Sequence, residues 1–193
     1  MEDIVMDKTI LCPSARPKSE DSVVFGIISG TVTEPRVAYL KQPLPITDEL
    51  IAKASPITPA EIFRTAAPCA IKGCQHFDGN DCRLAMRIIE KLPAIVEELP
   101  PCSIRRDCRW WQQEGKAACM RCPQVITDNY NASELAVKVA TPTSDYNKSK
   151  LNLFQQTYCN KNLHKEKIMS LENVQAFYAK LANDEAFRTH HLS

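Results

Sequence analysis

Hydrophobic residues occur along the chain in short runs that proline and glycine interrupt, a pattern that predicts small elements rather than long ones. Residues 23–28 are apolar and rich in β-branched side chains, and residues 36–40 offer a partner strand, so together they predict a β hairpin with its turn near Gly30. Because an isolated hairpin is only marginally stable in water, we expect it to pack against the rest of its domain.

Helical signals follow the hairpin. Residues 58–61 form a capping box with proline at the first helical position, and the helix that they begin should hold the next segment against the core. Apolar residues recur at near-helical spacing over residues 84–99, where Pro93 is expected to kink or split the helix. A further helix is expected over residues 103–114, with Gly115 as its C-terminal stop.

The two ends of the chain differ from this middle region. Residues 1–21 carry too little apolar surface to offset the entropy of ordering and are expected to be disordered, and residues 128–167 are typical of a linker. Residues 168–193 contain an amphipathic stripe. Residues 22–127 then form a Cys-rich metal-binding domain that begins with the β hairpin. The predicted fold is mainly α with a small β hairpin: a metal-stabilised, Cys-rich helical domain followed by a short C-terminal amphipathic helix.

Cysteine is the residue that most changes this picture. The chain has nine cysteines, and seven of them lie within residues 68–123: Cys69, Cys74, Cys82, Cys102, Cys108, Cys119 and Cys122. The N-terminal residues are acidic and no apolar segment of a signal peptide follows them, so we expect a cytoplasmic protein. In a reducing compartment, clustered cysteines favour metal ligands over disulfides. Cys12 and Cys159 lie outside the cluster, and we expect Cys12 to be exposed and both to be incidental.

The clustered cysteines form two weakly similar halves. Residues 68–74 and 101–108 both begin with Pro-Cys, a small residue, Ile and a basic residue, and both end on a second cysteine. The second half alone offers four thiolates, enough for one tetrahedral zinc ion or one [4Fe–4S] cluster: Cys102, Cys108, Cys119 and Cys122. The first half offers three, with His76 close by: Cys69, Cys74 and Cys82.

The ligand pattern favours iron over zinc. Zinc ribbons usually present two CxxC turns, whereas this chain has one, and Pro123 follows Cys122 as proline follows the last cysteine of bacterial ferredoxin motifs. We therefore expect a [4Fe–4S] cluster that serves redox sensing, electron transfer or assembly, with all seven clustered cysteines as candidate ligands. The alternative is a structural zinc module that binds a protein or a nucleic acid.

The charged residues indicate which kinds of partner the chain could bind. Several arginines surround Trp110 and Trp111, which suggests either a nucleic-acid surface or counter-charge for thiolates, and the formal net charge of +1 favours counter-charge. The chain has no apolar run of the ~20 residues that a membrane span needs. A thiol enzyme built on Cys74 and His76 would lack an identifiable orienting acid, so the sequence favours a binding protein over an enzyme.

Residues 169–188 read MSLENVQAFYAKLANDEAFR and resemble the opening of a nif-eleven leader-peptide domain. That family occurs in cyanobacteria and other bacteria, near nitrogen-fixation genes and as leader segments of ribosomally made, modified peptides. The resemblance implies a bacterial protein whose C-terminal helix binds a protein partner, and a leader or recognition protein of peptide natural-product biosynthesis is a further alternative. Residues 68–123 resemble uncharacterised bacterial Cys-rich proteins of the iron–sulfur-binding kind.

Overall fold

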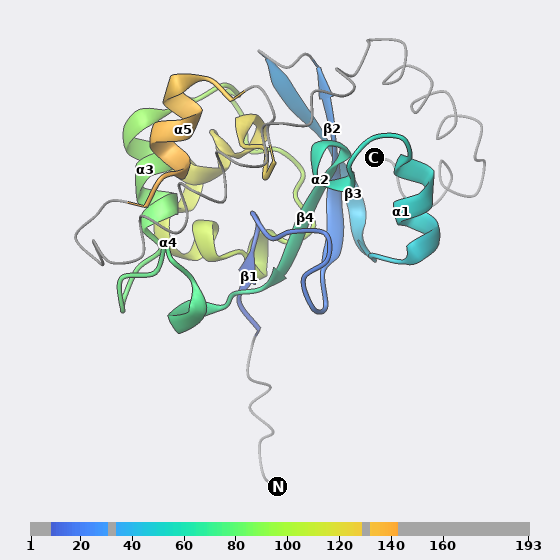
Figure 1. Cartoon of the computed structure of the whole chain (residues 1–193). Helices are drawn as coiled ribbons and strands as arrows, with labels where there is room; N and C mark the ends of the chain where they lie inside the picture. The colour runs from blue at the N-terminus through green and yellow to red at the C-terminus, as the bar shows by residue number, and fades with distance from the viewer. Residues whose placement is uncertain (1–8, 31–33, 129–131, 143–193) are drawn as a thin grey trace, which may run out of the picture.

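A four-stranded antiparallel sheet forms the centre of the computed structural model, which describes residues 9–30, 34–128 and 132–142 (Figure 1). Its strands follow one another in space as β1, β4, β2 and β3. They span Leu11–Cys12 (β1), Val23–Gly30 (β2), Pro35–Pro45 (β3) and Phe63–Pro68 (β4). The predicted hairpin is present as β2 and β3, although β3 is longer than the sequence pattern indicates.

The predicted fold class is wrong. The fold is mixed α and β around a sheet of four strands, rather than mainly α with a small hairpin, and the described residues show no group of three or more side chains arranged around one metal ion. The main cause is β4, which the capping box assigns to a helix. That helix, α2 (Pro59–Ile62), makes one turn, and the chain then becomes a strand that pairs with β2. Residues 63–67 of β4 are all buried, so the strand lacks the alternation that would identify it.

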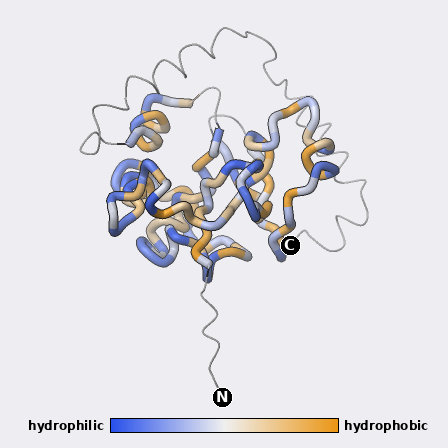
Figure 2. The backbone as a smooth tube through the Cα atoms, turned by 60° about the horizontal axis from the view of Figure 1, so that its bottom comes forward, coloured by the Kyte–Doolittle hydropathy of each residue, from blue (hydrophilic) through white to orange (hydrophobic). Residues whose placement is uncertain are grey.

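Two apolar cores lie on opposite faces of the sheet, because neighbouring residues of a strand point to opposite sides. Phe25 of β2 packs in one core with Trp110 and Ile88, whereas Val24 and Phe63 belong to the other. The first core lies beneath α3 (Arg83–Lys91), α4 (Arg109–Cys119) and α5 (Glu134–Ala140), and the second beneath α1 (Asp48–Ala54) and α2 (Figure 1). Hydrophobic segments alternate with hydrophilic ones along the described part of the backbone (Figure 2).

The helices follow their sequence signals only in part. Thr47 caps α1, accepting a hydrogen bond from the Leu50 amide at 3.2 Å. Helix α3 ends at Lys91, two residues before Pro93, as the predicted split requires. Helix α4 begins at Arg109 instead of near residue 103, because a 3₁₀ turn over Arg105–Asp107 precedes it. None of the helices in the described part of the chain is long and apolar enough to cross a membrane.

The predicted domain boundaries also differ from what the structure describes. Cys12, expected to be exposed in a disordered segment, is half-buried in strand β1. Helix α5 falls inside the predicted linker, yet its Val139 is 4% exposed and belongs to the core beneath α3 and α4. The Arg87 side chain of α3 donates a hydrogen bond to the Val139 carbonyl at 2.7 Å. The predicted C-terminal segment 168–193 lies outside the described residues.

Candidate metal centre

The four cysteines of the second half meet around one cavity. Two 3₁₀ turns and the two ends of α4 position them: Cys102 precedes the turn Arg105–Asp107, Cys108 ends it, Cys119 ends α4, and Cys122 begins the turn Cys122–Gln124. All four line the cavity, and apolar side chains form most of the remaining wall, including Phe25, Ile104 and Trp110. The structure therefore brings together the complete thiol set that the sequence predicts from this half.

The local backbone directs amide groups toward these sulfur atoms. Cys108 immediately precedes α4, and the amides of Trp110 and Trp111 lie close enough to its sulfur to favour the thiolate. The Ile104 amide does the same at Cys102. Free amides at the start of a helix stabilise negative charge, so this geometry suits a thiolate better than a neutral thiol.

Burial works against the thiolates. It raises the pKa of Cys102 to about 11, with the negative charge of Cys122 adding to the effect, and it raises the pKa of Cys108 further. Burial also raises the pKa of Cys119, although the Arg105 side chain opposes that shift. Cys102, Cys108 and Cys119 are thus protonated near neutral pH, and a bound cation would have to displace their protons.

A buried arginine that the sequence pattern does not single out supplies positive charge at this cavity. Arg64 of β4 is 0% exposed and donates hydrogen bonds to the Pro13 carbonyl at 3.0 Å and to the Val125 carbonyl. Its Nη2 also lies 3.5 Å from the Cys122 sulfur. A buried guanidinium needs compensating partners. The only sequence signal is an arginine inside an otherwise apolar run, which favours a surface position by itself.

Arg105 acts as a second cation beside the thiols. Its side chain interacts with the Cys119 sulfur and packs over the Trp111 ring at 5.5 Å. These contacts support the counter-charge interpretation of the arginines over the nucleic-acid one. Trp110 is 1% exposed and cannot offer a face to a base. Arg121 is likewise engaged, because it donates to the Leu92 carbonyl at 2.6 Å.

Two N–H donors on residues that line the cavity have no acceptor among the described residues. They are Arg105 Nε and Trp110 Nε1, and both are buried. Buried donors are rarely left without a partner in folded proteins. These two donors therefore lack partners in the same region of the molecule where the four thiols gather.

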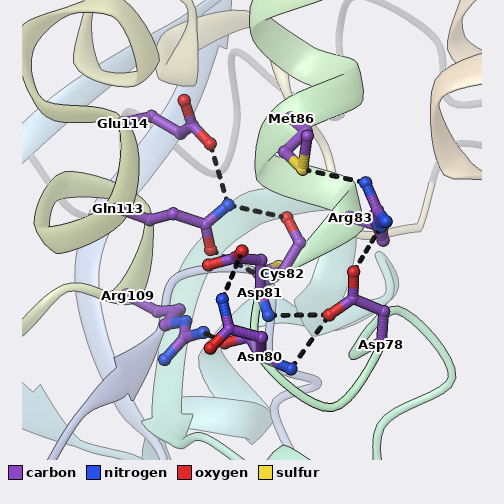
Figure 3. A network of polar contacts seen from close by, with 9 residues as sticks. All are labelled: Asp78, Asn80, Asp81, Cys82, Arg83, Met86, Arg109, Gln113 and Glu114. Carbon is purple, nitrogen blue, oxygen red and sulfur yellow. Dashed lines mark hydrogen bonds and ion pairs between the residues drawn. The ribbon is translucent and has the colours of Figure 1, made fainter.

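The cysteines of the first half lie along a separate loop. Cys69 follows β4, Cys74 ends the 3₁₀ turn Ile71–Gly73, and Cys82 precedes α3. Asp78 stabilises the loop by accepting hydrogen bonds from the amides of residues 80 and 81 and by pairing with Arg83 at 2.5 Å (Figure 3). These backbone hydrogen bonds lower the pKa of the Asp78 carboxyl. The hydrogen bonds of Asp78 therefore give this loop the role of a structural turn.

Arg87 is the side-chain partner of the His76 imidazole. The His76 Nδ1 lies 2.9 Å from Arg87 Nη2, and because a guanidinium can only donate, the imidazole accepts there. Burial, with the Arg87 charge in addition, lowers the pKa of His76 to about 4, so the ring is neutral at pH 7. This geometry disfavours a Cys–His nucleophile.

Tight single-ion geometry is absent from the described residues. In residues 9–30, 34–128 and 132–142, no three Cys, His, Asp or Glu side chains are grouped as ligands of one metal ion. The seven predicted ligands are thus placed by the structure in two neighbourhoods, without a preformed ion site. A four-iron cluster does not require such a grouping, because each thiolate binds a different iron atom.

Comparison with known proteins adds no assignment. No protein-family model matches the chain, and neither the curated proteins nor the solved structures provide a match. The resemblance of residues 169–188 to a nif-eleven domain therefore stays a prediction, and those residues lie outside the described part of the chain.

Proposed function

We propose that this protein is a cytoplasmic iron–sulfur protein that binds one [4Fe–4S] cluster through Cys102, Cys108, Cys119 and Cys122. The observation that carries the proposal is the convergence of these four thiols on one buried, largely apolar cavity. Thiolate-only ligand sets select soft metals, chiefly iron–sulfur clusters and zinc. Arg64 and Arg105 would offset the negative charge that four thiolates bring to the centre.

The unpaired donors favour a cluster over a zinc ion. A cluster carries inorganic sulfides that accept hydrogen bonds, and such bonds help to set its reduction potential. Arg105 and Trp110 line the cavity, and their Nε and Nε1 atoms have no acceptor among the described residues. A zinc ion would bring no acceptor beyond the thiolates themselves, whereas a cluster adds its sulfides.

Burial of the ligands favours a redox role over assembly. Cys108 and Cys119 are 7% and 9% exposed, and the buried side chains of Trp110 and Ile104 line the cavity beside them. A protein that delivers its cluster to an acceptor must expose the ligands during transfer, whereas electron transfer and redox sensing are compatible with a shielded cluster. The cluster is therefore a resident group that gains and loses an electron.

Anaerobic purification of the full chain tests the proposal. The protein should be brown and should contain about four iron and four sulfide for this centre. Cys119→Ala should lose that iron, whereas Met120→Leu, a volume-conserving change at the next buried residue, should keep it. Colourless protein with stoichiometric zinc would contradict the cluster, and Cys119→Ala with undiminished iron would contradict the ligand set.

A further inference from the structure

Cys12 lies beside the cysteines of the first half, although more than fifty residues separate it from them in the sequence. Strand β1 pairs with β4 so that Cys12 is opposite Ala67, and the ladder continues with a hydrogen bond from the Cys69 amide to the Ile10 carbonyl at 2.8 Å. Directly opposed residues point to the same face of a sheet, as do residues two apart on one strand. Cys12 and Cys69 are therefore diagonal neighbours on one face of the sheet.

The loop after β4 brings Cys74 and Cys82 together. A bridge pairs Phe77 with Cys82, and the Arg83 amide donates to the His76 carbonyl at 2.7 Å. The Phe77 amide in turn donates to the Cys74 carbonyl at 3.1 Å. Phe77 therefore links Cys74 to Cys82 within a closed turn that follows Cys69 and the short 3₁₀ turn.

Electrostatics agree that the four thiols are neighbours. Burial is the largest cause that raises the pKa of Cys12 to about 12, and the negative charges of Cys69, Cys82 and Cys74 add to it. Burial also raises the pKa of Cys82, where Cys74 and Cys69 act in the same way. The charges of Cys69 and Cys74 thus act at both Cys12 and Cys82.

The same backbone device serves both groups of cysteines. In each group, sulfur atoms face the amide of the residue two positions later, and a cysteine that precedes a helix also faces the amide three positions later. In the first group these contacts are Ser14 at Cys12, His76 at Cys74 at 3.4 Å, and Leu84 and Ala85 at Cys82. In the second group they are Ile104 at Cys102, and Trp110 and Trp111 at Cys108. Amides aimed at sulfur are the support that thiolate ligands of a metal centre need.

We propose that Cys12, Cys69, Cys74 and Cys82 form a second four-thiolate centre, which binds an iron–sulfur cluster of its own. This centre goes beyond the cluster already proposed at residues 102–122 and uses none of its ligands. Cys12 supplies the fourth thiolate that the first half lacks in the sequence, so the two halves become equivalent sites.

The two centres are adjacent in the fold. Leu11 of β1 forms a backbone bridge with Cys108, and Leu11 directly precedes Cys12. From the spacing of paired strands and of consecutive residues, the Cα atoms of Cys12 and Cys108 are at most about 9 Å apart. Clusters held this close would interact magnetically when both are reduced.

Reconstitution of the full chain with ferrous iron and sulfide under anaerobic conditions tests the second centre. Wild type should bind about eight iron per chain and Cys12→Ala about four, because each cluster needs four thiolates. Cys159→Ala is the matched control and should keep all the iron. Cys74→Ala, which lies outside both core clusters, should repeat the loss, so that halved iron does not depend on one variant.

Electron paramagnetic resonance spectra of the reduced proteins provide a second readout. Wild type should show a broadened, split signal, and Cys12→Ala the simple signal of a single cluster. Full iron in Cys12→Ala and Cys74→Ala, or zinc in place of iron at this centre, would overturn the proposal. Loss of iron in these variants but not in Cys108→Ala would instead overturn the cluster proposed at residues 102–122, so the two failures can be distinguished.

Discussion

At the scale of single residues, Arg64 connects the sheet to the candidate centre. It extends from the middle of the molecule, where β4 has neighbours on both sides, to Pro13, Val125 and Cys122. Its guanidinium also packs over the Phe25 ring at 5.5 Å. The residue therefore has both a structural role and an electrostatic one, and the two can be separated by experiment.

Replacement of this arginine by methionine should affect both roles. Arg64→Met leaves buried carbonyls unpaired and removes a cation near Cys122, so the free energy of unfolding should fall by about 3 kcal/mol. The reduction potential of the cluster should become more negative, because less positive charge favours the oxidised form. Urea unfolding and a redox titration measure the two effects. Arg36→Met, at an exposed position, should change neither, and an unchanged potential in Arg64→Met would remove Arg64 from the account of the centre.

Gly115 permits α4 to change direction before Cys119. Its φ of +56° and ψ of −137° are rarely adopted by residues with a side chain, yet nothing lies within 4 Å of an added Cβ. Gly115→Ala should therefore destabilise the protein through backbone strain alone, by roughly 1–3 kcal/mol. Gly73→Ala is the matched control, because the added Cβ would meet only the Ala70 Cβ at 3.8 Å. Equal melting temperatures for the two variants would contradict this explanation.

At the scale of elements, the sequence predicts those features that depend on local chemistry. The hairpin of β2 and β3, the end of α3 before Pro93 and the interruption at Gly115 all follow from residues at or near the feature. Strands β4 and β1 could not be predicted in this way. Strand β4 is buried on both faces and resembles a helical segment, and the two-residue β1 exists only because β4 pairs with it.

The candidate site also has one part that the sequence predicts and another that it does not. The second group of four cysteines is contiguous enough for its spacing to predict a single centre. The first group appears incomplete in the sequence, because Cys12 reaches it only through the pairing of β1 with β4. Arg64 was likewise unpredictable, since its partners at Pro13, Val125 and Cys122 come from two distant segments.

The Gln113 side chain connects α4 to Cys82, the residue that precedes α3. Gln113 of α4 accepts a hydrogen bond from the Cys82 amide at 2.7 Å and donates to the Cys82 carbonyl at 3.2 Å (Figure 3). Gln113→Ala should lower the free energy of unfolding by about 1–2 kcal/mol and increase amide exchange at Cys82, because the amide loses its acceptor. Gln112→Ala, at the exposed neighbouring position, should change exchange at Cys82 little. Equal exchange in both variants would show that this link is unimportant.

At the scale of the whole molecule, the described residues contain both groups of cysteines and both cores. The prediction for the C-terminal segment follows from that arrangement. Truncation after Lys167 removes residues 168–193 and should leave the iron content and the melting temperature unchanged. Truncation after Ala132 also removes α5, with the buried Val139 and the acceptor of Arg87, and should lower the melting temperature. A loss of iron after truncation at Lys167 would show that residues 168–193 belong to the domain.

Mössbauer spectroscopy can show directly whether thiolates of this chain hold iron–sulfur clusters. The full chain would be produced with isotope-enriched iron and isolated without oxygen. Nearly all the iron should give the quadrupole doublet of oxidised [4Fe–4S] clusters. Cys108→Ala and Cys12→Ala should each lose about half of the area of this doublet. A protein that carries zinc and no cluster iron, or whose cluster iron is unchanged in both variants, would contradict the proposal that these thiolates hold iron–sulfur clusters.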